Sequence, residues 1–101
     1  MRVSMFLFLL VLMPLAVHAG GASLSGEALF NSTALGGNGK SCASCHPQGK
    51  GLGQIGDYDD AILEEFVNFC IRDAMKGQML PQGAPELQTL ARYLRQFQSA
   101  K

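Results

Sequence analysis

The sequence predicts an all-α fold in which three main helices form one small domain. Apolar residues recur at helical spacing in two long segments, about 60–76 and 85–97. Residues that favour helix starts precede these segments, and glycines gather between them. No segment shows the strand–helix–strand alternation of a βαβ unit.

The N-terminal residues, 1–19, are predicted to be a secretory signal peptide. Arg2 precedes an apolar run over 3–17, and small residues occupy the two positions that a signal peptidase reads, ending at Ala19. The run is shorter than the ~20 residues that span a bilayer, and Pro14 interrupts it. We therefore expect export and cleavage after Ala19; the alternative is an uncleaved membrane anchor.

The remaining residues, 20–101, are expected to form a single domain. A domain this small buries little apolar surface and usually needs a staple such as a cofactor. The whole chain carries eight basic and eight acidic residues and has no long basic run. This charge pattern suggests neither a nucleic acid nor a membrane surface as a partner.

A short first helix is predicted over about 24–30, begun by Ser23 or Ser25. Gly26 and Phe30 lie four residues apart and therefore share one face of it. A glycine-rich loop leads from this helix to the next motif.

The five residues from Cys42 to His46 read Cys-Ala-Ser-Cys-His. C-x-x-C-H is the attachment signature of a c-type haem. The thiols of Cys42 and Cys45 can form thioethers with the two vinyl groups of the porphyrin, and His46 is then carried beneath the ring, where it can bind the iron. The motif predicts one covalent haem c per chain.

Zinc and redox alternatives find less support in the sequence. Zinc needs four ligands, usually with a second Cys/His pair, and outside the motif the chain offers only Cys70 and His18. A thioredoxin-like dithiol would be expected near a βαβ pattern. His18 leaves with the signal peptide, so His46 is the only histidine of the mature chain. Haem would also be the staple, and we expect the haem-free chain to be largely unfolded.

The middle helix is predicted over about 60–76, with Asp59 or Asp60 as its N-cap and with Lys76 and Gly77 at its last turn and C′ position. Its apolar face comprises Ile62, Leu63, Phe66, Val67, Phe69, Cys70 and Ala74.

The last helix is predicted to begin at Pro85, a residue suited to the first helical position. An apolar stripe at helical spacing follows, and core packing explains it. The stripe consists of Leu87, Leu90, Ala91, Leu94 and Phe97, with Arg92, Arg95 and Gln96 opposite.

Over nearly all of its mature length the chain resembles the class I (mitochondrial-type) cytochromes c. The resemblance is carried by Gly26 and Phe30, the motif at 42–46, Met79 in a loop, and the run Leu90-Ala91-Arg92-Tyr93-Leu94. It implies a cytochrome c-like fold around one haem, with Gly26 packed against the Leu90/Tyr93/Leu94 face. It also implies haem attachment outside the cytoplasm, and hence a periplasmic protein.

Two further resemblances concern shorter segments. Residues 36–42 are similar to the approach to a haem site in bacterial di-haem peroxidases, but the chain has one haem motif, so their chemistry does not carry over. Residues 68–71, 75–77 and 84–87 resemble haem domains of thiosulfate-oxidation cytochromes, in packing more than in function.

The sixth iron ligand is expected to be a methionine, because His/Met ligation is usual in electron carriers. Met79 follows the middle helix and its Gly77 stop, so a loop can bring it across the haem, although Leu80 separates it from the proline that usually follows directly. Met75 is the alternative, with core filling as its other role. An open iron is the third possibility.

Three other side chains bear on the site. Tyr58 either donates a hydrogen bond to the haem or is an ordinary half-buried tyrosine. The carbonyl that accepts the second ring N–H of His46 is expected in the loop 50–56. Cys70 is either a buried small hydrophobe or the source of an intermolecular disulfide.

The predicted function is one-electron transfer to and from redox proteins, without catalysis. No Ser/His/Asp set is possible, because His46 is used by the iron. The alternatives are a ligand-binding or peroxidase-type haem protein with an open sixth site, and a cytochrome subunit of a larger oxidoreductase.

Overall fold

The computed structural model describes residues 24–99, so the predicted signal peptide at 1–19 lies outside the described residues. Within 24–99 the chain is all-α and contains no strand, as the sequence predicts. Its α-helices are α1 (Gly26–Asn31), α2 (Cys42–Cys45), α3 (Asp60–Phe69) and α4 (Pro85–Leu94). Short 3₁₀ segments are η1 (Pro47–Gly49), η2 (Gly53–Asp57) and η4 (Arg95–Phe97), and a π turn, η3 (Cys70–Ala74), follows α3.

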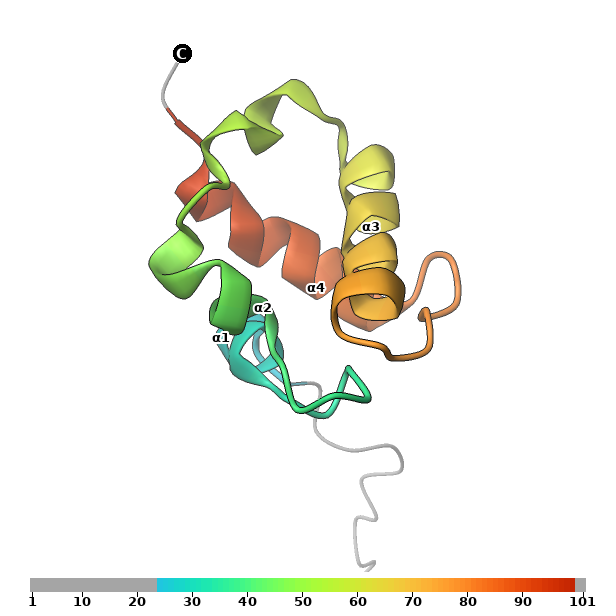
Figure 1. Ribbon diagram of the computed structural model, residues 1–101. Coiled ribbons are helices and arrows are strands. Elements are labelled where there is room, and N and C mark those ends of the chain that lie inside the picture. The colour runs from blue at the N-terminus through green and yellow to red at the C-terminus, as the bar shows by residue number, and fades with distance from the viewer. Residues whose placement is uncertain (1–23, 100–101) are drawn as a thin grey trace, which may run out of the picture.

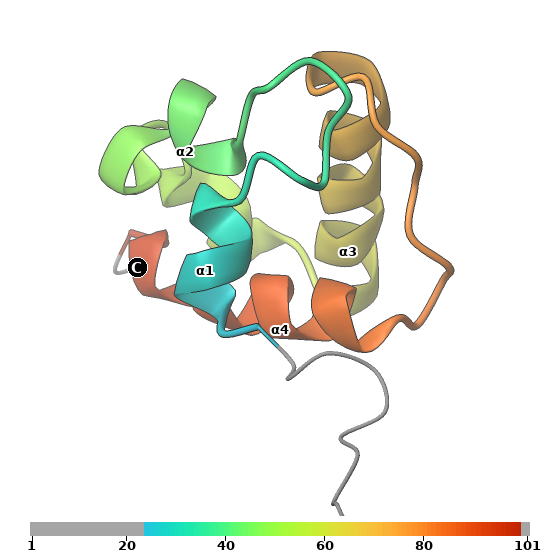
Figure 2. The same ribbon diagram turned by 90° about the horizontal axis from the view of Figure 1, so that it is seen from below.

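Helix α4 is the base on which the other main helices pack. Both α1 and α3 contact α4, while α2 and α3 face one another across the molecule and η2 joins their ends (Figure 1). Turning the molecule shows that the loop between α1 and α2 reaches over to the C-terminal end of α3 (Figure 2). No helix within the described residues is long and apolar enough to cross a membrane.

The first helix begins at Ser25, one of the two expected residues. The Ser25 hydroxyl accepts a hydrogen bond from the Ala28 N–H (3.1 Å), which satisfies one of the free donors at the helix start. Gly26 lies directly against Tyr93 of α4, and a Cβ at Gly26 would collide with the Tyr93 Cβ. The crossing of the first and last helices through Gly26 is thus confirmed.

The middle helix begins where expected but ends differently. Asp59 caps it by accepting from the Ile62 N–H (2.9 Å). Instead of one α-helix to residue 76, the α-helix stops at Phe69 and a π turn follows, in which the Met75 N–H donates to the Cys70 carbonyl (3.0 Å). The left-handed residue at the helix end is Lys76 (φ 54°), not Gly77.

Gly77 is nevertheless required to be glycine, for a packing reason. A Cβ there would collide with the Leu35 carbonyl in the loop before α2. The Gly77 N–H also donates to the Ile71 carbonyl (2.7 Å), which closes the widened turn. The glycine that the sequence suggested as a helix stop is thus needed for a different reason: it lets the chain after the π turn pack against the loop before α2.

The apolar stripe of α4 forms the core, as predicted. Its buried members are Leu87, Leu90, Ala91 and Leu94, which pack with residues of α1 and α3. Arg95 is not on a purely solvated face, because its side chain is only 27% exposed. It donates to the Ile55 and Tyr58 carbonyls (3.0 and 2.8 Å) and to the Asp60 carboxylate, and so ties α4 to η2 and α3.

Candidate haem site

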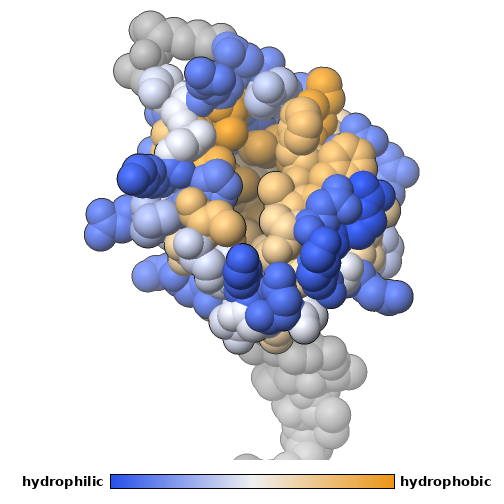
Figure 3. Space-filling model, viewed as in Figure 1, coloured by the Kyte–Doolittle hydropathy of each residue, from blue (hydrophilic) through white to orange (hydrophobic). Residues whose placement is uncertain are grey.

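A deep cleft opens between α2, η2 and α3, on the face shown in Figure 3. It has a volume of about 250 Å³ and is open to solvent on one side. Its walls are almost entirely apolar apart from one histidine and four sulfur-bearing side chains. The lining residues are Phe30, Ser41, Cys42, Cys45, His46, Leu52, Ile55, Tyr58, Leu63, Phe66, Val67, Cys70, Ala74, Met75 and Leu94.

The C-x-x-C segment forms one capped helical turn, α2. The Ser41 hydroxyl accepts from the Ser44 N–H (3.2 Å), and the Ser44 hydroxyl accepts from the Ser41 N–H (2.9 Å). This reciprocal capping holds Cys42 and Cys45 three positions apart on one helical turn, so both thiols border the same cleft. This turn was not among the predicted helices, although the Ser-x-x-Ser spacing around the cysteines resembles a capping box.

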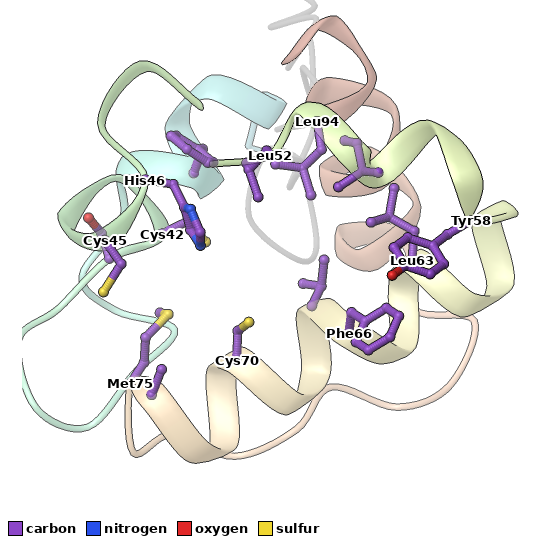
Figure 4. Close-up of a pocket in the computed structure, with 15 residues that line it drawn as sticks. Cys42, Cys45, His46, Leu52, Tyr58, Leu63, Phe66, Cys70, Met75 and Leu94 are labelled. Carbon is purple, nitrogen blue, oxygen red and sulfur yellow. The ribbon is translucent and has the colours of Figure 1, made fainter. Parts of the chain in front are cut away.

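His46 projects from the end of this turn into the cleft (Figure 4). Its Nδ1 lies 2.8 Å from the Lys50 carbonyl oxygen. Because a carbonyl can only accept, Nδ1 carries the proton of this bond, and in the neutral ring Nε2 then has the lone pair. The expected carbonyl in the loop 50–56 is therefore that of Lys50. This bond fixes the ring and leaves Nε2 as a potential metal ligand.

Met75 and Cys70 line the opposite wall of the cleft and point towards its interior (Figure 4). Both come from the end of α3, where the π turn lies: Cys70 is its first residue and Met75 follows its last. Met75 is 2% exposed. The cleft thus has His46 on one side and two sulfur side chains on the other.

Met79, favoured from the sequence as the iron ligand, lies away from the cleft. Its side chain is 45% exposed, and its sulfur contacts the Arg72 guanidinium at 3.9 Å. The loop is held there by the buried Asn68 side chain of α3, which accepts from the Leu80 N–H (2.8 Å) and donates to the Leu80 carbonyl (2.9 Å). This pair of bonds holds the loop on the outside of α3. The structure thus groups Met75, not Met79, with Cys42, Cys45 and His46.

Cys70 has a position that neither sequence-based interpretation anticipated. It faces the two motif cysteines across the cleft and is accessible through the cleft mouth. Burial raises the pKa of the Cys70 thiol, and the nearby Cys45 sulfur adds to the effect. Burial also raises the pKa of Cys42, with Cys70 as the next contribution. The three cysteines therefore line one cleft, and helical spacing alone could not have revealed this.

The described residues contain no group of three or more His, Cys, Asp or Glu side chains placed to hold a metal ion by themselves. Comparisons with protein-family models, with curated proteins and with solved structures found no match for this chain.

Proposed function

We propose that this protein is a periplasmic one-electron carrier with a cytochrome c-like fold around one covalent haem c. The observation that carries the proposal is the position of the C-x-x-C-H motif, which faces a buried methionine across an apolar cleft. The motif is typical of covalent haem attachment, and the cleft combines apolar walls with a histidine and a methionine, two common ligands of haem iron.

The residues of the cleft fit the cofactor in three respects. Cys42 and Cys45 offer free thiols on one helical turn for the two thioethers. The Nε2 of His46 is left free by the bond from Nδ1 to Lys50. The remaining walls are apolar side chains from α3, α4 and η2, which would exclude water from a flat apolar ligand.

Bound haem would supply an iron that changes between the ferrous and ferric states. Cys42 and Cys45 would anchor it, and His46 would be one axial ligand. For the other axial ligand we propose Met75 in place of Met79, because only Met75 borders the cleft. A thioether opposite histidine raises the reduction potential and closes the iron to outside ligands, as an electron carrier requires.

Cys70 is a second candidate for the sixth ligand, since its thiol lines the same wall of the cleft as Met75. A haem with a vacant sixth position, able to bind gases or peroxide, is the functional alternative. A subunit of a larger oxidoreductase is the other, and co-purification of a stoichiometric partner would identify it.

The visible spectrum of the purified holoprotein tests the proposal. We expect low-spin bands and the red sulfur-to-iron absorption in the ferric state, with no change in the ferrous spectrum on adding carbon monoxide. Met75→Ala should abolish the red absorption and allow carbon monoxide to bind. Met79→Ala is the matched control and should leave both properties unchanged.

Other results would point elsewhere. A high-spin wild-type spectrum that shifts with carbon monoxide would favour the open-site alternative. Loss of the low-spin spectrum in Cys70→Ser, with Met75→Ala unaffected, would identify the thiolate as the ligand. If Met79→Ala alone removes the red absorption, the loop must rearrange when haem binds, and Met75 is not the ligand.

A further inference from the structure

The loop that precedes the C-x-x-C-H motif also caps the helix end that carries Met75. We infer that Asn38, with Gly36 and Gly37, is a positioning element that holds Met75 on the iron; this inference rests on the proposed function. Residues 36–38 are called the distal cap below. The cap lies outside the motif and contributes no side chain to the cleft.

Three hydrogen bonds connect the distal cap to the end of the π turn. The N–H groups of Gly37 and Asn38 both donate to the Met75 carbonyl (2.7 and 3.2 Å). The Asn38 side-chain amide donates to the Ala74 carbonyl (3.1 Å). The last carbonyls of a helix have no partner within it, so the cap supplies partners for the carbonyl of Met75 and for the one before it.

The glycines of the cap permit this close approach. A Cβ at Gly36 would lie 2.5 Å from the Met75 carbonyl oxygen and 2.6 Å from its Cβ. A Cβ at Gly37 would collide with the Lys76 carbonyl. The backbone of the cap therefore rests directly on Met75, which explains why this methionine is buried although it borders an open cleft.

Asn38 also connects the cap to the haem-attachment side. Its Oδ1 accepts from the Lys40 N–H (3.1 Å), two residues before the motif, while its Nδ2 bonds to Ala74. One side chain thus joins the backbone that leads into Cys42 to the backbone that carries Met75. It ties the two walls of the cleft together and would limit how far Met75 can move from His46.

The consequence concerns the strength of the bond between Met75 and iron. If the cap is weakened, the π turn frays and Met75 leaves the iron more often. A small neutral ligand such as imidazole can then occupy the sixth position. Loss of one hydrogen bond of this kind costs about 0.5–1.5 kcal/mol, so we expect imidazole to bind the ferric protein about two- to twelvefold more tightly.

Asn38→Asp tests this in the holoprotein, because it keeps an oxygen that accepts from Lys40 and replaces the amide donor by a charged oxygen that cannot donate to Ala74. Asn31→Asp is the matched control: Asn31 also donates from its side chain to a helix carbonyl, that of Glu27, but within α1. The measurement is an imidazole titration followed by loss of the red sulfur-to-iron absorption. We expect tighter imidazole binding in Asn38→Asp and a change below about 1.5-fold in Asn31→Asp, in keeping with its exposed local bond.

Each remaining outcome decides a separate question. Equal imidazole affinity in wild type and Asn38→Asp would overturn the positioning role while leaving Met75 as the ligand. Absence of the red absorption in the wild type would overturn the Met75 proposal itself, and with it this role. If Asn38→Asp does not retain haem, Asn38→Ser removes the same amide without adding charge and must give the same increase.

Discussion

At the scale of single residues, Met75 and Met79 are only four positions apart but lie in different environments: Met75 is buried, and Met79 is 45% exposed. Met75 is held against the cleft by backbone bonds from residues 37 and 38. The loop of Met79 is held on the outside of α3 by the paired bonds between Asn68 and Leu80. The sequence favoured Met79 as the iron ligand because a residue in a loop can be brought across the haem easily. Here Asn68 removes that freedom.

Cys70 carries a prediction at the same scale. Since its thiol faces the cleft rather than the outer surface, haem would cover it. We expect the folded holoprotein to stay monomeric on a non-reducing gel and to react with Ellman's reagent only after denaturation. Cys70→Ser is the control and should show no thiol under either condition. A disulfide-linked dimer of the wild type would contradict this placement.

At the scale of secondary-structure elements, the crossing of α1 and α4 depends on the absence of one side chain. Gly26 leaves room for Tyr93, whose ring also packs on Phe30 with centroids 5.4 Å apart. We expect Gly26→Ala to lower the free energy of unfolding, since overpacking costs about 1–3 kcal/mol and the lower chain entropy of alanine returns only part of that. Guanidinium unfolding of the holoprotein measures it.

Gly56→Ala is the matched control for this substitution. A Cβ at Gly56 would have its nearest neighbours at 3.6 Å, an ordinary van der Waals distance. The free energy of unfolding should therefore change by no more than about 0.5 kcal/mol. Equal effects of the two substitutions would mean that the Gly26–Tyr93 contact does not limit the helix crossing.

The π turn at Cys70–Ala74 has no signature in the sequence. The apolar spacing of residues 60–76 is compatible with a continuous α-helix, and no residue type marks a π turn. The widening depends on bonds from outside the helix: residues 37 and 38 hold the Met75 carbonyl, and Asn38 holds that of Ala74. Such turns are frequent at functional sites, and this one begins at Cys70 and ends just before Met75, both of which line the cleft.

At the scale of the whole molecule, the proposed haem would complete the apolar core. The core residues Ile55, Leu63 and Val67 also line the cleft, and Phe66 beside them is 45% exposed. A domain of this size has little other apolar surface to bury. Haem bound in the cleft would cover these side chains and complete the core.

We therefore expect the double variant Cys42→Ala/Cys45→Ala, which cannot form thioethers, to lose most of its helical circular dichroism at 222 nm. The physical reason is the uncovered cleft, whose burial contributes about 25 cal/mol for each Å² of apolar surface. Cys70→Ala removes a cysteine without touching attachment and should keep both haem and helicity. A fully helical, cooperatively unfolding double variant would show that the fold does not need haem.

The all-α class, the starts of the three longer helical segments and the motif from which haem is proposed could all be read from the sequence. This was possible because caps, helical periodicity and the C-x-x-C-H spacing act within a few residues of chain, as the Ser25 and Asp59 caps illustrate. Which methionine and which further cysteine share the cleft with His46 depends instead on the three-dimensional arrangement of the chain. That arrangement depends on hydrogen bonds between residues far apart in sequence, 36 positions from Asn38 to Ala74 and 12 from Asn68 to Leu80, and no local pattern encodes them.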